Sequence, residues 1–220
     1  MAGIKAVIFD FDGLMVDTEW PAFVAWTEIY QEHGHVLDLK EWVACVGASY
    51  AAFDPVTRLQ ELTGKAFERD VLIGDKERRK IDECNRLQAL PGVVERLKEA
   101  MALGIKAAVA SSSSFGWVDG HLSRLALKDH IELIRTRDDV KRIKPHPDLY
   151  LAAAAGLKVD PVDCVVFEDS LNGVKAAKAA GMTCYAIPNR VTSVLDFREA
   201  DGRYDSLALV SLKNLQLRRF

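Results

Sequence analysis

The sequence predicts an α/β protein built on a doubly wound parallel sheet, with a helical segment inserted after the first strand. Apolar runs at residues 6–9, 105–110 and 164–167, interrupted only by Lys106, have the composition of strands buried on both faces. From residue 105 onward such runs alternate with helix-like segments, the order expected for parallel strands joined by crossover helices. Residues 17–86 instead show helical spacing throughout and no buried-strand pattern.

The elements follow in order along the chain. After the strand at 6–9 we expect helices at 16–33, 41–46, 53–63 and 67–87, each supported by apolar residues at helical spacing or by high charge. Pro91 and Gly92 mark a loop, and an amphipathic helix restarts at residue 93 and ends before Gly104. The remaining elements are strands at 105–110, 131–134, 164–167 and 183–187, helices at 118–125, 148–155 and 171–180, and a weak strand candidate at 207–210.

Composition excludes several classes of protein. A net charge of −3 with scattered basic residues gives no field for a polyanion, so we expect no nucleic-acid partner. No run of 18 apolar residues occurs, so we expect no membrane partner. The four cysteines lie far apart without a Cys-x-x-Cys pair, which indicates free thiols in a reducing compartment. We therefore predict a cytoplasmic protein.

Polar clusters follow three of the predicted strands. Asp10 and Asp12 follow the first strand, Ser111 follows the second, and Glu168 and Asp169 follow the strand at 164–167. Because ligands bind beyond the carboxyl ends of strands in open parallel sheets, we expect these clusters to meet. Neighbouring carboxylates repel unless a cation neutralises them, and hard oxygen ligands suit Mg²⁺. The set is typical of metal-assisted phosphoryl transfer through an aspartyl-phosphate.

Four ordered motifs identify a family resemblance. They are Asp10-Phe11-Asp12-Gly13, Ser111, Lys144-Pro145, and Glu168-Asp169-Ser170 with Gly173. They resemble the motifs of the haloacid dehalogenase-like (HAD) superfamily, over about residues 4–187. The residues beside them are similar to the branch of sugar-phosphate phosphatases and β-phosphoglucomutases. The resemblance implies a Rossmann-like core at residues 1–16 and 87–220 and an all-helical cap domain at residues 17–86.

The resemblance implies a role for each motif residue. Asp10 would be the nucleophile, and Asp12 would protonate the leaving alkoxide and then activate water. Ser111 and Lys144 would act with them by holding the phosphoryl oxygens and offsetting negative charge, with Ser112 as a further phosphate-binding residue. The other serines of this run are expected to be loop or helix-capping residues.

The metal ligands expected from the resemblance are all carboxylates. Asp169 would ligate Mg²⁺ directly, and Glu168 would ligate it or hold a metal-bound water. Asp10 and Asp12 complete the predicted metal set. Because a true haloacid dehalogenase needs only the first aspartate and no metal, the other three carboxylates argue against that activity.

The helical insertion decides between hydrolysis and mutase activity. β-Phosphoglucomutases carry a His and an Arg in the cap, and by counting these positions are Ala22 and Tyr50 here. Neither can bind a phosphate as a cation would. Glu19 is typical of phosphatase-like members.

We predict that the protein is a monomer that catalyses Mg²⁺-dependent hydrolysis of a small phosphorylated metabolite, specifically a sugar phosphate. The alternatives are a β-phosphoglucomutase-like mutase and a non-catalytic phosphometabolite sensor. Residues 42–53 of the cap and the surroundings of Trp20 are expected to set specificity.

Overall fold

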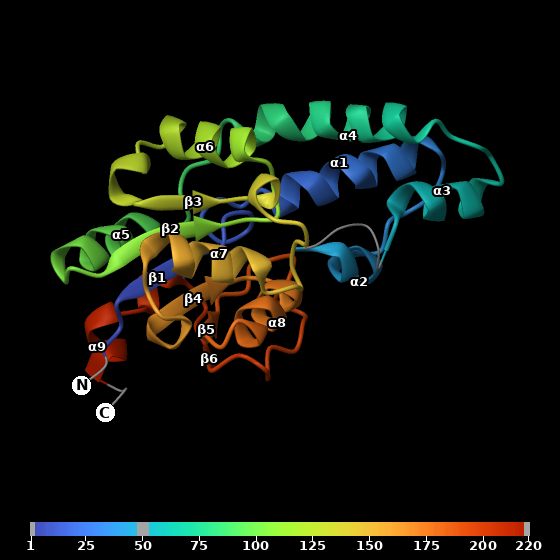
Figure 1. The fold of residues 1–220 in the computed structure, drawn as a ribbon. Helices are drawn as coiled ribbons and strands as arrows, with labels where there is room; N and C mark the ends of the chain where they lie inside the picture. The colour runs from blue at the N-terminus through green and yellow to red at the C-terminus, as the bar shows by residue number, and fades with distance from the viewer. Residues whose placement is uncertain (1–2, 48–52, 218–220) are drawn as a thin grey trace.

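The computed structural model describes residues 3–47 and 53–217, which contain a six-stranded parallel sheet with the order β3-β2-β1-β4-β5-β6 (Figure 1). The strand order reverses between β1 and β4, so the crevice for ligands lies beyond the carboxyl ends of these two strands. The predicted fold class is confirmed. The strands are β1 (Ala6–Phe9), β2 (Lys106–Ala110), β3 (Leu133–Arg135), β4 (Cys164–Glu168), β5 (Thr183–Ala186) and β6 (Gly202–Arg203).

Helices cover both faces of the sheet because side chains alternate along each strand. Val7 and Phe9 of β1 belong to an apolar cluster shared with α5 (Val93–Ala102), α6 (Phe115–Arg124) and α9 (Leu212–Leu217). Ala6 and Ile8 point to the other face, where α7 (Asp148–Leu157) and α8 (Leu171–Ala179) pack. Burial on both faces explains why β1 carries no polar residue before its end.

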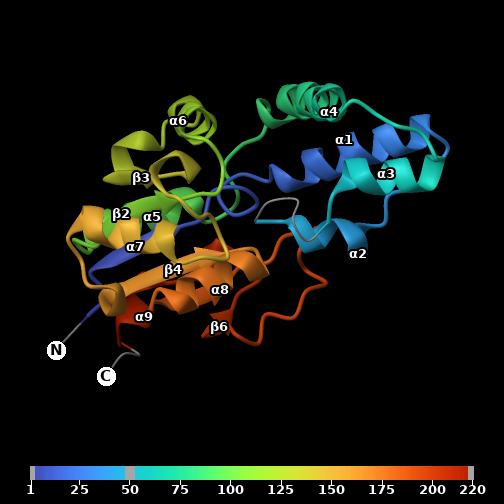
Figure 2. The same ribbon diagram turned by 45° about the vertical axis from the view of Figure 1, so that its right-hand side comes forward.

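In the described part of the segment between β1 and α5, helices joined by loops follow the turn at Asp12–Val16. Its helices are α1 (Glu19–Glu32), α2 (Leu39–Trp42), the short η1 (Val43–Cys45), α3 (Pro55–Thr63) and α4 (Arg69–Cys84). They extend away from the sheet in both views (Figures 1 and 2). Trp26, Tyr30 and Leu59 are fully buried in an apolar cluster separate from those of the sheet. This arrangement agrees with the expected cap, although the boundary at residues 17 and 86 stays a prediction.

The region after β5 differs from the sequence-based expectation. The predicted strand at 207–210 is wrong, because Leu207–Leu209 form a short 3₁₀ helix, η5. Leu207 and Val210 pack into the cluster beneath α5, so their apolar character reflects burial without strand pairing. The two-residue strand β6 and the helix α9 were not predicted. No helix in the described part of the chain has the length and apolar character needed to cross a membrane.

Candidate active site

Strands β1, β2 and β4 bring the predicted site residues together. Phe9 of β1 is in register with Val109 of β2 and Phe167 of β4, so the residues that follow each strand lie at one edge. The Asp10 amide donates to the Phe167 carbonyl at 3.0 Å and extends this pairing. Asp10, Ser111, Glu168 and Asp169, which lie up to 159 positions apart in the numbering, therefore surround the crevice at the switch point.

Lys144 lies between two of these carboxylates. Its ammonium donates to Asp10 Oδ1 and, at 2.6 Å, to Glu168 Oε1, and the side chain is almost fully buried. Burial alone would lower the pKa of Lys144, but the two carboxylates raise it above its ordinary value. Lys144 is therefore charged in this site. Burial raises the pKa of Asp10 well above its usual range, Lys144 opposes that shift, and Glu168 and Asp12 add to it.

Glu168 is fixed by donors on both of its oxygens. Oε1 also accepts from the Tyr150 hydroxyl at 2.6 Å, and Oε2 accepts from the backbone amide and hydroxyl of Ser170 at 3.1 and 3.0 Å. Gly173 leaves room for this carboxylate, because a Cβ at that position would lie 1.7 Å from Glu168 Oε1. Glu168 is completely buried and both of its oxygens accept hydrogen bonds. The fixed carboxylate therefore holds the Lys144 ammonium in place.

Asp169 occupies the side of the crevice nearest the turn after β1. Asn189 donates to Asp169 Oδ2 at 2.7 Å and to the Gly13 carbonyl at 3.1 Å, which ties the two loops together. Gly13 has a φ of +81°, and a Cβ there would lie 2.3 Å from Asp169 Oδ2. Burial raises the pKa of Asp169 well above its ordinary range, and the charges of Asp10 and Glu168 add to the shift.

The carboxylates of Asp10, Glu168 and Asp169 form a group that could hold a cation. Their ligand oxygens all lie within 4.8 Å of one another, and all three residues are buried. Lys144 supplies one positive charge against three carboxylates, which leaves the group short of positive charge. A divalent ion would correct this shortage, and the donor set is the hard oxygen type that Mg²⁺ prefers. The residues present therefore fit the predicted metal.

The Asp12 carboxylate does not join this group. Oδ1 accepts from Thr18 Oγ1 at 2.7 Å and from the Trp117 indole N–H at 2.8 Å. Oδ2 accepts from Ser113 Oγ at 2.7 Å and from Ser111 Oγ at 3.2 Å. Burial alone would raise the pKa of Asp12, but the charge of Lys80 and the hydrogen bonds from Ser113, Thr18 and Trp117 lower it. Three of these donors follow β2 or lie in α6, and the fourth, Thr18, precedes α1. Because both oxygens of Asp12 are bonded to these donors, the structure does not support the predicted metal-ligand role of its side chain. The Asp12 carboxyl is placed beside Ser111, where it can act as an acid and base.

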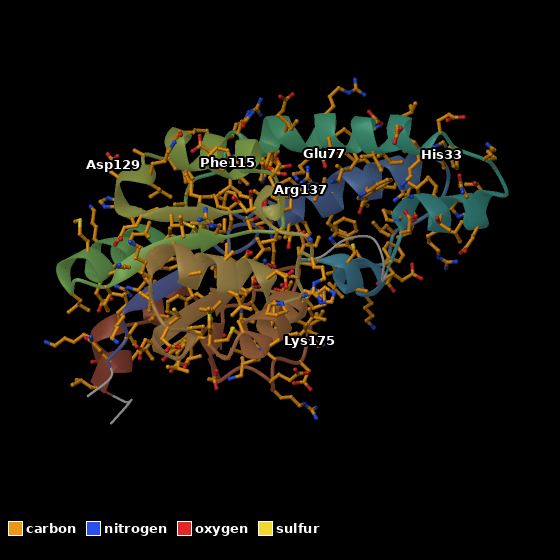
Figure 3. All side chains as sticks on the ribbon, in the orientation of Figure 1. His33, Glu77, Phe115, Asp129, Arg137 and Lys175 are labelled. Atoms are coloured by element: carbon orange, nitrogen blue, oxygen red, sulfur yellow. The ribbon has the colours of Figure 1, made fainter. Side chains whose placement is uncertain are left out.

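A cavity of about 480 Å³ opens between the sheet edge and the helical segment. Asp10, Asp12 and the serines after β2 form its floor, and side chains of α1 and α4 form its roof. Lys76 is buried in this roof and pairs with Glu77 at 2.7 Å. Figure 3 shows Glu77 on α4 and Arg137 on the core, and both line the cavity. The roof therefore carries both signs of charge.

Of the two positions at which mutases carry cations, the structure describes Ala22 but not Tyr50. Ala22 is buried and lines the cavity, so the position carries no group that could bind a second phosphate. Tyr50 lies outside the described residues, as does the rest of 48–52 within the predicted specificity segment at 42–53. Glu19 lines the cavity, and burial followed by the charge of Asp12 raises the pKa of its carboxyl to about 7.

The loop after η1 touches the core directly. Ser112 Oγ donates to the Gly47 carbonyl at 3.3 Å, and Asn172 Nδ2 donates to the Val46 carbonyl at 2.9 Å. Ser112 lines the cavity, but its hydroxyl is directed to the helical segment in this arrangement, which does not support its predicted phosphate contact. Gly47 has a φ of +75°, and a Cβ there would lie 2.2 Å from Ser170 Oγ, so only glycine lets the loop approach this closely.

Several residues of the site are not evident from the sequence. Tyr150, Asn189, Ser113 and Trp117 all donate to the predicted carboxylates. Ser113 belongs to the serine run for which loop or capping roles are expected. The other three lie on helices or loops without a local motif, so only the tertiary fold reveals them.

Comparison with known proteins gives consistent matches over nearly the whole chain. The haloacid dehalogenase-like hydrolase family matches residues 7–187. "Putative phosphatase YhcW" of Bacillus subtilis is 45% identical over 209 residues, covering 95% of this chain and 94% of the relative.

Solved structures agree with this match. The structure of a CbbY mutant from Rhodobacter sphaeroides in complex with xylulose-(1,5)-bisphosphate has a TM-score of 0.77 at 27% identity, covering 94% of this chain and 96% of that one. A β-phosphoglucomutase from Clostridium difficile has a TM-score of 0.80 at 25% identity, covering 98% and 96%.

Proposed function

Because this chain belongs to the haloacid dehalogenase-like hydrolase family and is a phosphatase, we propose that it hydrolyses a small phosphorylated metabolite, a sugar phosphate, through an aspartyl-phosphate on Asp10. The observation that carries this proposal is the placement of Asp10 between the Lys144 ammonium and the acidic pair after β4. In the proposed first step a carboxylate oxygen of Asp10 forms a bond to phosphorus as the bond from phosphorus to the leaving oxygen breaks.

Asp12 is the proposed acid and base. Its carboxyl gives a proton to the departing alkoxide and then takes one from the water that attacks the phosphorus of the aspartyl-phosphate, which releases phosphate and restores Asp10. Two features support this role: Asp12 shares the cavity floor with Asp10, and Ser111 and Ser113 hold its second oxygen beside that floor. A separate nucleophile and acid–base residue is what a two-step hydrolysis requires.

Asp10 and Asp169 are the proposed ligands of Mg²⁺, with Glu168 nearby. Glu168 already accepts bonds on both oxygens, so its role is to hold Lys144 and to add negative charge to the site. When bound, Mg²⁺ would neutralise charge on the phosphoryl group and on the nucleophile. The raised pKa values of Asp10 and Asp169 support this proposal, because both groups must be ionised to work and a cation would favour the ionised form.

The proposed substrate class follows from the roof of the cavity. The helical insertion, proposed here as a cap at residues 17–86, presents Lys76, Lys80 and Glu19 to whatever is attached to the phosphoryl group. Carboxylates and ammonium groups together suit a polyhydroxylated leaving group, since they offer both acceptors and donors. A structural relative binds xylulose-(1,5)-bisphosphate, which supports a phosphorylated carbohydrate as the kind of substrate. A cytoplasmic monomer remains our expectation.

A β-phosphoglucomutase activity is the second candidate because one structural relative carries that name. A mutase must keep and recapture a bisphosphate, which requires a cation where this chain has Ala22. The small apolar side chain therefore favours hydrolysis.

Phosphate release from sugar phosphates and nucleoside monophosphates, assayed with Mg²⁺ and after exhaustive chelation, tests the proposal. β-Glucose 1-phosphate with a trace of the bisphosphate is assayed alongside. We expect Mg²⁺-dependent release, fastest on a sugar phosphate and absent in Asp10→Asn. Isomerisation to glucose 6-phosphate without release would make the protein a mutase, undiminished release without metal would overturn the metal assignment, and no turnover would favour a sensor.

A further inference from the structure

The indole of Trp117 connects the floor of the active site to the helical segment above it. Its Nε1–H donates to Asp12 Oδ1 at 2.8 Å, and the Lys80 ammonium lies 4.2 Å from the centre of the same ring system. Asp12 follows β1, Trp117 lies in the first turns of α6, and Lys80 belongs to α4 (Figure 1). One side chain of the core thus contacts both the proposed acid–base residue and a cation of the insertion.

Trp117 differs in kind from the other donors to Asp12. Thr18, Ser111 and Ser113 donate through hydroxyl groups, which can rotate and can also accept a hydrogen bond. An indole N–H can only donate, and its direction is fixed by the plane of the ring. Among the four donors, Trp117 is therefore the one that can set a single orientation of the carboxylate as the hydroxyls exchange partners with substrate.

The ring is itself held firmly on the core side. His121 lies one turn further along α6 and makes an edge contact with Trp117 at a centroid distance of 4.3 Å. His121 is buried, and its Nδ1 lies 2.9 Å from Arg124 Nη2. The start of α6 is fixed in turn, because the Phe115 amide donates to Asp138 at 2.8 Å. The indole therefore has a defined place before any substrate binds.

Lys80 contacts the ring from the other segment of the protein. Its side chain is 14% exposed, and its nearest carboxylate is that of Glu77, at 3.7 Å on the same helix. A cation over an indole is attracted by the ring face. Because Lys80 belongs to the insertion, this contact exists only when α4 lies beside α6 (Figures 1 and 2).

We propose that Trp117 is a positioning residue for Asp12, and that Lys80 secures the indole when the helical insertion lies over the core. The inference rests on the acid–base role proposed for Asp12. It makes the orientation of that carboxylate depend on the position of the insertion, so leaving-group protonation is most efficient when the cavity is closed.

The test compares two substrates that differ in their need for a proton. The alkoxide of a sugar phosphate must be protonated as it leaves, whereas 4-nitrophenolate leaves as a stable anion. We use the sugar phosphate hydrolysed fastest in the panel above, together with 4-nitrophenyl phosphate, and compare kcat/KM, which reports on steps up to departure of the leaving group. In Trp117→Phe, which keeps an aromatic ring and removes the N–H, we expect kcat/KM to fall about tenfold or more on the sugar phosphate. The fall on 4-nitrophenyl phosphate should stay within about threefold.

Phe115→Leu is the control. Phe115 lies two positions before Trp117 in α6, the residue is 48% exposed, and it makes no side-chain contact with Asp12 that the structure records. The ratio of the two kcat/KM values should be unchanged in this variant. Equal losses on both substrates in Trp117→Phe, or no loss on either, would overturn the positioning role.

Lys80→Met tests the link to the insertion. We expect a selective loss on the sugar phosphate of about threefold, the scale of a single cation–aromatic contact. When Lys80→Met is combined with Trp117→Phe, we expect no further selective loss. Full additivity, or equal losses on both substrates, would show that Lys80 acts independently of the indole. Asp12→Asn is measured in parallel: if it too lacks the selective loss, the acid–base role itself fails, and if only Trp117→Phe lacks it, this inference alone fails.

Discussion

Lys144 donates a hydrogen bond to Glu168 at 2.6 Å, and both side chains are almost completely buried. The same ammonium contacts Asp10, which directly follows β1. Because Tyr150 of α7 and Ser170 after β4 both donate to Glu168, the position of the charge beside the proposed nucleophile depends on these two segments. The stability of the fold and the chemistry of the site are therefore coupled through one buried lysine.

We expect Lys144→Met to destabilise the protein and to abolish activity. Removing the ammonium leaves two buried carboxylates without their cation, and breaking a buried ion pair in this way costs about 3–5 kcal/mol of unfolding free energy. Urea denaturation of the metal-free protein measures the change. Lys178→Met is the control, because Lys178 pairs with Asp201 at 2.6 Å where both side chains are about one-third exposed. That pair should contribute at most about 1 kcal/mol, and equal effects of the two variants would contradict the assignment.

Gly173→Ala should disrupt the site through a steric effect. A Cβ at this position would lie 1.7 Å from Glu168 Oε1, so the carboxylate or the start of α8 must move. We expect loss of activity and a lower free energy of unfolding, by about 1–3 kcal/mol as for other overpacked interiors. Gly120→Ala, in the middle of α6, is the matched change, because a Cβ there would have nothing within 4 Å. In Gly120→Ala we expect stabilisation of about 0.5–1 kcal/mol from helix propensity. If Gly173→Ala kept full activity and stability, Glu168 would not be tightly packed against this position.

Local sequence patterns predicted the main site residues, whereas contacts that arise only in the tertiary fold could not be predicted. The convergence of Asp10, Ser111 and Glu168 was predictable, because parallel strands all end at one edge of a sheet. The strand prediction for residues 207–210 was wrong, because a short apolar run has no period that distinguishes a strand from another buried segment. Tyr150 and Trp117 could not be predicted as partners of the site, because their contacts cross from helices that no local pattern places near the carboxylates.

Asp10→Asn should abolish turnover while the protein still folds. The amide has the shape of the carboxyl group but cannot form the aspartyl-phosphate, and loss of a nucleophile lowers kcat by at least about a hundredfold. Folding should be retained because the change removes a charge that burial disfavours. Phosphate release and circular dichroism are measured on the same preparation, with Asp196→Asn as control at an exposed carboxyl that pairs with Arg198. Activity above about 1% of the wild type would remove Asp10 as the nucleophile.

The Glu19 carboxyl should make the stability of the metal-free protein fall as the pH rises. Burial and the nearby charge of Asp12 raise its pKa from 4.5 to about 7, so between these values the folded protein holds a proton that the unfolded chain has released. The unfolding free energy therefore decreases across this window and the loss is complete above about pH 7. In Glu19→Gln the group cannot ionise. We expect this variant to match the wild type near pH 4.5 and to exceed its stability at pH 8 by about 1–3 kcal/mol, a range that allows for partial exposure.

Urea denaturation in a chelating buffer at several pH values from 4.5 to 8 measures this difference. Glu32→Gln provides a control of opposite sign, because the hydrogen bond from Arg79 lowers the pKa of Glu32. Its ionised form is favoured by folding, so the stabilisation is present above the unfolded pKa and is lost as the pH falls. Glu32→Gln should therefore be less stable than the wild type at pH 8 and should approach it in acid. If the difference between Glu19→Gln and the wild type does not change with pH, the Glu19 carboxyl is already solvated and ionised in the cavity, and the roof beside Asp12 is more open than the structure shows.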